Sequence, residues 1–166
     1  AGVDKMLTVR DEFAAMPQVK DVTLSFEIPD GGYSNDIPIL RYGRDSTQAI
    51  TAAILESDER FLSVYQIPLT AGTAFQGHRS DSLQVILNET AVKALGLQNA
   101  QHAIGQQVKI PGNPEVYTVK GVMNDFHFAT MQTKIAPVIM FNLQYDFIYR
   151  YMSFKLNPGN IQSDIN

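Results

Sequence analysis

Asp125 and His127 form the closest acid–imidazole pair in the sequence. On a strand, residues two apart share a face, so both side chains can meet one metal ion or one substrate proton. The simpler interpretation, which we favour, is that Asp125 accepts hydrogen bonds from turn amides after a strand, while His127 is a surface or packing residue. A hydrolase or metal enzyme centred on this pair is kept as an alternative.

Other patterns that carry chemistry are missing from the sequence. It has no G-x-x-x-x-G-K-[ST] or G-x-G-x-x-G loop for nucleotide phosphates, no H-E-x-x-H metal motif and no G-x-S-x-G nucleophile turn. It also has no cysteine, which excludes disulfides, thiolate metal ligands and a cysteine nucleophile. We therefore expect no catalytic residue, no cofactor and no metal site.

Four aromatic residues near the C-terminus recur at every second position. They are Tyr145, Phe147, Tyr149 and Tyr151, and in an extended segment all four stand on one face. A cross-strand ladder in the core is the simpler interpretation. The alternative is a partner-facing patch, because tyrosine is enriched at protein interfaces. Such a patch supports a second hypothesis, a secreted module that binds a small ligand or a peptide.

The composition is that of an acidic globular domain. The 166 residues are 45% hydrophobic and 18% charged, and the formal net charge is −4 with a sequence pI of about 5.3. This sign of charge argues against generic nucleic-acid binding, which favours a basic surface. No run approaches the roughly 20 apolar residues that a membrane helix needs, so we expect no membrane span within the sequence.

Hydrophobic periodicity predicts the elements that position these residues. Helices are expected over 3–16, before Pro17, over 59–65, capped by Ser57-Asp58, and from Asn88 to about Leu95. The expected strands cover 22–28, 48–56, 83–87, 106–110, 116–123, 137–142 and 149–156. A shorter candidate over 37–42 contains Pro38, which favours an edge position. About three helices and seven strands that do not strictly alternate predict an α+β fold with mixed sheets.

Several short motifs occur in a recognisable order between residues 56 and 137. They are Ser57-Asp58-Glu59-Arg60-Phe61, Leu69-Thr70-Ala71-Gly72, Asn88-Glu89-Thr90-Ala91, Leu95-Gly96, Ile104-Gly105 and Lys120-Gly121-Val122-Met123-Asn124-Asp125-Phe126. In this order the sequence resembles the extracytoplasmic core domain of MacB/FtsX-type ABC transporter permeases, and the resemblance covers nearly the whole chain. One position departs from the family pattern, because Thr73 follows Gly72 where the family often has arginine. We assign Thr73 no role.

The resemblance implies a domain on the extracytoplasmic face of the bacterial inner membrane, between the first and second membrane helices of a permease. It implies no active site. The motif positions matched by Gly72, Asn88, Glu89, Gly105, Gly121 and Asp125 are expected to be structural. The implied partners are the permease's own membrane helices, a second permease copy, a separate or fused cytoplasmic ATPase and an extracytoplasmic adaptor protein. Such a domain couples ATPase-driven conformational change to extracytoplasmic substrates or partners.

The same resemblance implies two lobes. Residues 1–56 with 128–166 are expected to form the outer lobe, and residues 57–127 the lobe inserted into it. The opening helix is expected to continue the first membrane helix, and the two ends of the chain are expected to lie together.

Overall fold

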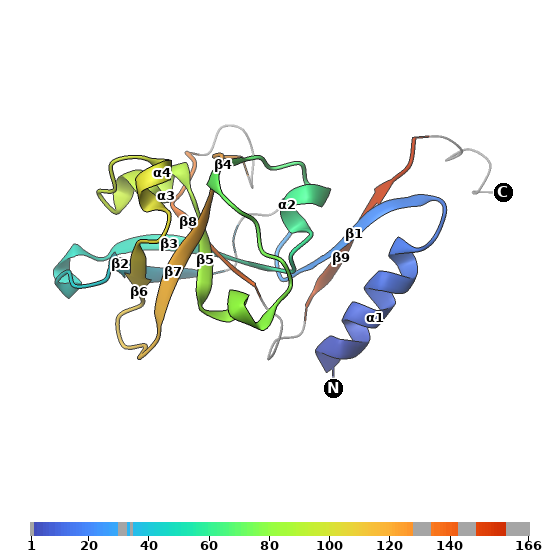
Figure 1. Cartoon of the computed structure of the whole chain (residues 1–166), viewed down its shortest axis with the longest axis horizontal. Coiled ribbons are helices and arrows are strands. Elements are labelled where there is room, and N and C mark those ends of the chain that lie inside the picture. The colour runs from blue at the N-terminus through green and yellow to red at the C-terminus, as the bar shows by residue number, and fades with distance from the viewer. Residues whose placement is uncertain (1, 30–32, 34, 128–133, 143–148, 159–166) are drawn as a thin grey trace.

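The computed structural model describes residues 2–29, 33, 35–127, 134–142 and 149–158. In these residues the chain forms four α-helices and nine strands, which confirms the α+β class (Figure 1). The helices are α1 (Gly2–Ala14), α2 (Phe61–Val64), α3 (Glu89–Ala94) and α4 (Ala100–Ala103). The strands are β1 (Val19–Ser25), β2 (Asp36–Arg41), β3 (Ile50–Ser57), β4 (Leu69–Gly72), β5 (Gln84–Asn88), β6 (Gln107–Lys109), β7 (Val116–Met123), β8 (Val138–Asn142) and β9 (Tyr151–Leu156). Two 3-10 helices, η1 (Ser46–Gln48) and η2 (Arg79–Leu83), precede β3 and β5.

Six of the strands close into a barrel. Their pairings run β2–β6–β7–β5–β8–β3, and β3 pairs with β2 to complete the ring. β3 pairs with β8 in parallel, as does β5 with β7, while the other pairs of the ring are antiparallel. β4 pairs antiparallel with the second half of β7, beyond the reach of β6. Closure gives each strand of the ring two neighbours and removes the open edges of a flat sheet.

The barrel strands contribute to two hydrophobic clusters. Val85 and Leu87 of β5 enter the cluster that α3 covers, whereas Ile86 between them enters the cluster that contains Phe61 of α2. This alternation follows from the two-residue period of a strand. Because both faces are covered, the strand reads as a continuous apolar run rather than as an alternating one.

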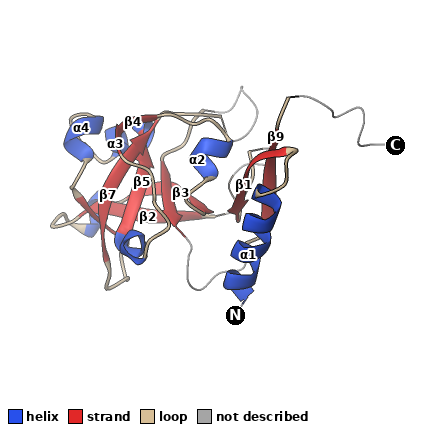
Figure 2. Ribbon diagram, turned by 45° about the vertical axis from the view of Figure 1, so that its right-hand side comes forward, coloured by secondary structure: helices blue, strands red, loops and turns tan. Residues whose placement is uncertain are grey.

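α1, β1 and β9 form a layer beside the barrel (Figures 1 and 2). β1 and β9 pair antiparallel along their length, whereas β1 reaches β3 through one register pair, Ser25 with Ser57. α1 covers one face of this pair of strands, where the rings of Phe13 and Phe154 meet edge to face at 5.2 Å. Two antiparallel strands alone are marginal in water, so the pair depends on packing against helices.

The described ends of the chain do not lie together. Asn157, just after β9, donates its backbone N–H to Gln18 and its side-chain amide to Pro17, beyond the C-terminal end of α1. The N-terminal end of α1 is a helix length away, about 20 Å for 13 residues. Within the described part of the chain, no helix is both long enough and apolar enough to cross a membrane.

Three predicted elements differ from the structure in an instructive way. β1 begins at Val19, and both its faces are buried from Val22 to Ser25, where Thr23 is bonded to Asp58 instead of facing water. β2 pairs on both sides, but β6 reaches only Leu40 and Arg41, so Pro38 has a neighbour on one side only. α2 is one turn long and has no side-chain cap. Strands from both sides of residue 57 join the barrel, and the division into lobes at 57 and 127 stays a prediction.

Candidate functional site

Arg10 is a buried charge on the core-facing side of α1. It lies three residues from Leu7 and three from Phe13, within the apolar stripe of the helix, and only 5% of it is exposed. Its Nη1 atom lies 2.7 Å from Oδ2 of Asp58 and 3.0 Å from Oε1 of Glu59. The stripe that fastens α1 to the rest of the molecule therefore contains an ion pair.

Asp58 is fully buried just after β3 and accepts hydrogen bonds from three segments. Its Oδ2 atom accepts from Arg10 and, at 2.9 Å, from the backbone N–H of Leu24 in β1. Its Oδ1 atom accepts from the hydroxyl of Thr23 and, at 3.0 Å, from the backbone N–H of Arg60 before α2. One carboxylate thus connects α1, β1 and the start of α2.

Asp11 and Arg60 extend this pair toward the surface. Oδ1 of Asp11 lies 3.0 Å from Nη2 of Arg10 and 2.9 Å from Nη2 of Arg60. The side chain of Asp11 is 54% exposed, so solvent screens its attraction and the bond between Arg10 and Asp58 is the stronger one. We call the whole set the ionic joint; its members are Arg10, Asp11, Thr23, Asp58, Glu59 and Arg60.

In the ionic joint, the charged state of buried Arg10 and that of buried Asp58 stabilise each other. Burial raises the pKa of Asp58 above its usual value, although Thr23, Arg10 and the amide of Leu24 act in the opposite direction. Burial alone would lower the pKa of Arg10, but the carboxylates of Asp58, Glu59 and Asp11 raise it, so the guanidinium stays charged. Removing one partner of such a pair leaves an uncompensated buried charge, which is strongly destabilising.

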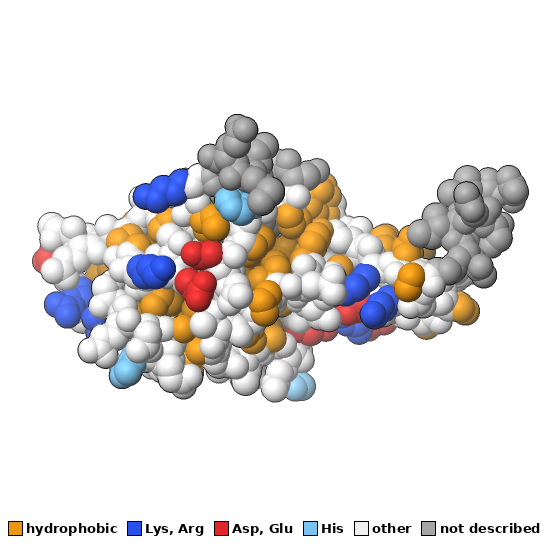
Figure 3. Space-filling view, turned by 90° about the horizontal axis from the view of Figure 1, so that it is seen from above, with side chains coloured by type: hydrophobic (Ala, Val, Ile, Leu, Met, Phe, Trp, Pro, Cys, Tyr) orange, Lys and Arg blue, Asp and Glu red, His pale blue; other side chains and the backbone are white. Residues whose placement is uncertain are grey.

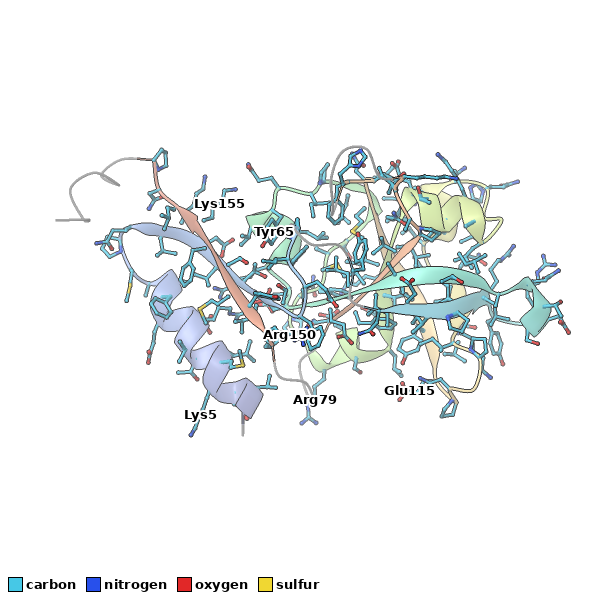
Figure 4. All side chains as sticks on the ribbon, turned by 180° about the vertical axis from the view of Figure 1, so that it is seen from behind. Lys5, Tyr65, Arg79, Glu115, Arg150 and Lys155 are labelled. Atoms are coloured by element: carbon cyan, nitrogen blue, oxygen red, sulfur yellow. The ribbon has the colours of Figure 1, made fainter. Side chains whose placement is uncertain are left out.

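The C-terminal segment reaches the same junction. Arg150 donates its backbone N–H to the carbonyl of Ser25, and its guanidinium lies 4.5 Å from the ring centre of Phe26. The hydroxyl of Tyr65, at the end of α2, lies 2.8 Å from Oγ of Ser153 in β9. In Figure 4, Tyr65 and Arg150 lie between the barrel and the α1–β1–β9 layer. Both terminal elements are therefore fastened beside α2.

The predicted aromatic face is only partly described. Tyr145 and Phe147 lie outside the described residues. Tyr149 is 2% exposed, and burial together with the nearby charge of Asp58 raises its pKa, which places it against the ionic joint. Tyr151 is 41% exposed on β9. A partner contact through these residues stays a prediction.

No motif identified the ionic joint from sequence. A usable signal was the position of Arg10, a cation inside the apolar stripe of the opening helix, because unpaired charges are rarely buried. The partner of Arg10 could not be inferred from a local pattern, since Asp58 lies 48 residues further on. A capping role beside the next helix explained that carboxylate equally well.

Three of the predicted motif residues, Asn88, Glu89 and Asp125, meet instead at the start of α3, whereas Gly72 pairs with Gly121 between β4 and β7 and Gly105 lies after α4. Oδ1 of Asn88 accepts from the backbone N–H of Ala91 at 2.9 Å, which confirms the predicted helix cap, and from that of Val138 at 2.8 Å. The carboxylate of Asp125 accepts from the backbone N–H and the hydroxyl of Thr90, at 3.0 and 2.7 Å. These bonds tie α3 to β8 and to the segment after β7.

The carboxylate of Asp125 is thus occupied by Thr90, while His127 is exposed. Glu89 accepts from the hydroxyl of Thr70 at 3.1 Å and, at 3.4 Å, from the backbone N–H of Asp125. Within the described ranges, no three His, Asp or Glu side chains gather in a way that suits a metal ion. Of the acid–imidazole pair identified in the sequence, Asp125 therefore makes a structural contact and His127 lies at the surface.

A second buried carboxylate, Asp81, fixes the 73–83 segment to the barrel. It is 1% exposed and accepts from Nζ of Lys120 at 2.5 Å and from the backbone N–H groups of Gln76, Gly77 and His78. Burial alone would raise its pKa, but Lys120 and the backbone donors outweigh burial and lower it.

We expect this carboxylate to make stability depend on pH. A lowered pKa in the folded state means that the stabilisation is complete above the unfolded value of about 4 and is lost as the pH falls through the folded value. Asp81→Asn should cost about 2–3 kcal/mol at pH 7, because it removes a charged hydrogen-bond partner. It should also remove this part of the acid sensitivity. Urea unfolding of both proteins between pH 3 and pH 7 measures the effect, and parallel pH profiles would contradict it.

Three solved structures share this fold. A domain of a putative permease protein from Porphyromonas gingivalis is 15% identical with a TM-score of 0.61, and the match covers 90% of this chain and 66% of that one. The periplasmic region of MacB from Actinobacillus actinomycetemcomitans is 15% identical with a TM-score of 0.54, covering 84% and 66%. The extracellular domain of the noncanonic ABC-type transporter YknZ from Gram-positive bacteria is 13% identical with a TM-score of 0.60, covering 88% and 70%. The chain spans about two thirds of the length of these structures.

The fold is thus that of the extracytoplasmic domains of transporter permeases. The sequence profile of the MacB-like periplasmic core domain matches residues 4–164, and the chain belongs to this family. The resemblance read from the ordered motifs is thereby confirmed. No curated protein sequence matches the chain significantly.

Proposed function

We propose that this domain is a non-catalytic coupling element of an ABC transporter permease. It lies outside the cytoplasm and transmits movement of the first membrane helix, through α1, to the barrel and from there to extracytoplasmic substrates or partners. The cytoplasmic ATPase, separate or fused, supplies the movement, and a second permease copy completes the transporter. Membership of the MacB-like family supports the general kind of protein.

The observation that carries the proposal is the bond between Arg10 and Asp58. α1 is connected to the segment after β3 by this buried bond of 2.7 Å and by the more exposed pairs of Arg10 with Glu59 and of Asp11 with Arg60. A buried ion pair is geometrically specific, because displacement of either partner leaves a charge uncompensated in a medium of low dielectric constant. A shift of α1 is therefore passed to Asp58, and so to α2 and β1, rather than absorbed by sliding of apolar side chains.

Paired spin labels in the full permease with its ATPase test this proposal. The domain has no cysteine, so Lys5→Cys labels α1 and Leu83→Cys labels the end of η2, immediately before β5 of the barrel, in each of the two permease copies. With the normal joint, we expect the distance between symmetry-related labels to change between ATP and ADP states at both sites. With Arg10→Met and Asp58→Asn combined, the change at residue 5 should persist and that at residue 83 should fall by at least half.

The matched control is Arg60→Met, which removes the outer bond to the exposed Asp11 and the 3.7 Å contact with Glu59 but leaves the bond between Arg10 and Asp58 in place. It should leave the change at residue 83 intact. An unchanged response at residue 83 in the double variant would refute the coupling role of the ionic joint.

A further inference from the structure

A hollow of about 320 Å³ opens where α2 ends. Its lining combines the apolar or aromatic Tyr65, Ile67, Pro68 and Phe126 with the polar Gln66, Asp125 and His127. It is at the lower end of the range of pocket volumes that bind ligands, and its mixture of apolar walls and a few polar groups is typical of them. It is large enough to take one apolar side chain of a partner.

The hollow is connected to the ionic joint by a single helical turn. Arg60, whose amide donates to Asp58, immediately precedes α2, and Tyr65 immediately follows it. Tyr65 is also bonded to Ser153 of β9. A displacement of Asp58 is therefore transmitted through α2 to Tyr65, which lines the hollow.

The backbone at the rim is held in an unfavourable conformation. Gln66 has a φ of +56°, and within the described residues no other non-glycine residue has a positive φ. Glycine is the usual residue at this position after a helix. Non-glycine residues in left-handed conformations tend to occur at binding sites, where the surrounding structure holds them. Here Gln66 and Ile67 donate backbone N–H groups to Ser63 and Leu62 of α2.

The charge beside the hollow is negative. Asp125 is fixed by Thr90, and Glu89 lies next to it, bonded to Thr70 and to the amide of Asp125. None of the residues that line the hollow is a lysine or an arginine. Figure 3 shows acidic side chains beside an apolar stretch on this face, and α1 begins on the opposite, lower side of the molecule in Figure 1.

We propose that this hollow is the docking site for an extracytoplasmic partner protein, which inserts one apolar side chain and places a neighbouring lysine or arginine against Asp125 and Glu89. The inference rests on the proposed function and adds the site at which the transmitted movement leaves the domain. Charge complementarity favours a basic partner segment over a second copy of this chain, whose formal net charge is −4.

Amide NMR shifts of the 166-residue chain test the site with two blocked dipeptides, N-acetyl-Leu-Lys-amide and N-acetyl-Leu-Glu-amide. The lysine peptide should shift the amides of Gln66, Asn124, Phe126 and His127 in a saturable way. The glutamate peptide should bind at least tenfold more weakly. Pro68→Lys, which places a cation at an exposed residue of the lining, should weaken binding of the lysine peptide at least tenfold, whereas Leu83→Lys, at a residue 47% exposed on η2, should not.

Absence of saturable shifts around the hollow would overturn the proposal, as would equal binding of the two peptides or an equal loss in both variants. If sedimentation shows that the chain self-associates and that Pro68→Lys separates the copies, the face belongs to a second copy and the proposal is likewise overturned. These results are independent of the spin-label experiment, because they do not involve Arg10 or the membrane. A result that contradicts the docking proposal can therefore be distinguished from one that contradicts the coupling proposal.

Discussion

Replacing Arg10 with methionine is expected to lower the free energy of unfolding by about 3–5 kcal/mol at pH 7, as for other buried ion pairs that lose one partner. Methionine retains a long unbranched stem in the apolar stripe of α1, so most of the packing is kept. What is lost is the bond of 2.7 Å to Asp58, whose carboxylate then stays buried without its cation. Urea unfolding of the isolated chain measures the change.

This variant should also respond to pH in a characteristic way. Without the guanidinium, the pKa of Asp58 in the folded state rises further above the unfolded value of about 4. A folded state that binds a proton more tightly than the unfolded state gains stability as the pH falls through the folded pKa. The deficit of Arg10→Met relative to the normal chain should therefore be smaller at pH 5 than at pH 7.

Two further variants separate the buried charge from a general disturbance of α1. Adding Asp58→Asn to Arg10→Met removes the uncompensated charge and should restore about 2 kcal/mol or more. Arg60→Met, which removes the pair with the exposed Asp11 and a longer contact of 3.7 Å with Glu59, should change stability by about 1 kcal/mol or less. A deficit that is the same at both pH values and unchanged by Asp58→Asn would show that the pair is not energetically coupled.

The parts of the fold that were predictable from sequence have local signals. The opening helix follows from a stripe of apolar residues, the cap at Asn88 from one residue type, and the β6–β7 hairpin from the turn residues between its strands. β4 and α4 were missed because four residues are too few to show a period. Barrel closure depends on pairings such as Ala53 with Val138, which leave no local trace.

Only those parts of the candidate site that have a local sequence signal were predictable. A helix-capping role for Asn88 could be inferred because its acceptor function is local. The ionic joint combines residues from three separate segments, and each of them also has an ordinary local explanation. The partner of Asp125 was likewise distant, since Thr90 lies 35 residues earlier in the chain. Sequence patterns therefore identified the residues that matter for the family more easily than the contacts that they make.

The motif glycines are expected to differ sharply in their tolerance of a side chain. Gly72 has a φ of +73°, and a Cβ atom there would lie 2.2 Å from the backbone oxygen of Lys120 and 2.9 Å from Cα of Gly121. Gly105 has a similar φ of +79°, but a Cβ atom there meets nothing within 4 Å. The pair therefore offers the same backbone strain with and without a steric clash.

Gly72→Ala should lower the free energy of unfolding by about 3–5 kcal/mol, since the left-handed conformation costs alanine about 1–2 kcal/mol and the clash with the backbone of β7 adds at least as much. Gly105→Ala should cost only about 1–2 kcal/mol. Urea unfolding of the two variants measures the cost of the backbone strain and of the clash. Equal losses of unfolding free energy would show that β4 can move away from β7 without penalty. If the larger loss is found, the close approach of Gly72 to Gly121 is what fixes β4 against the barrel.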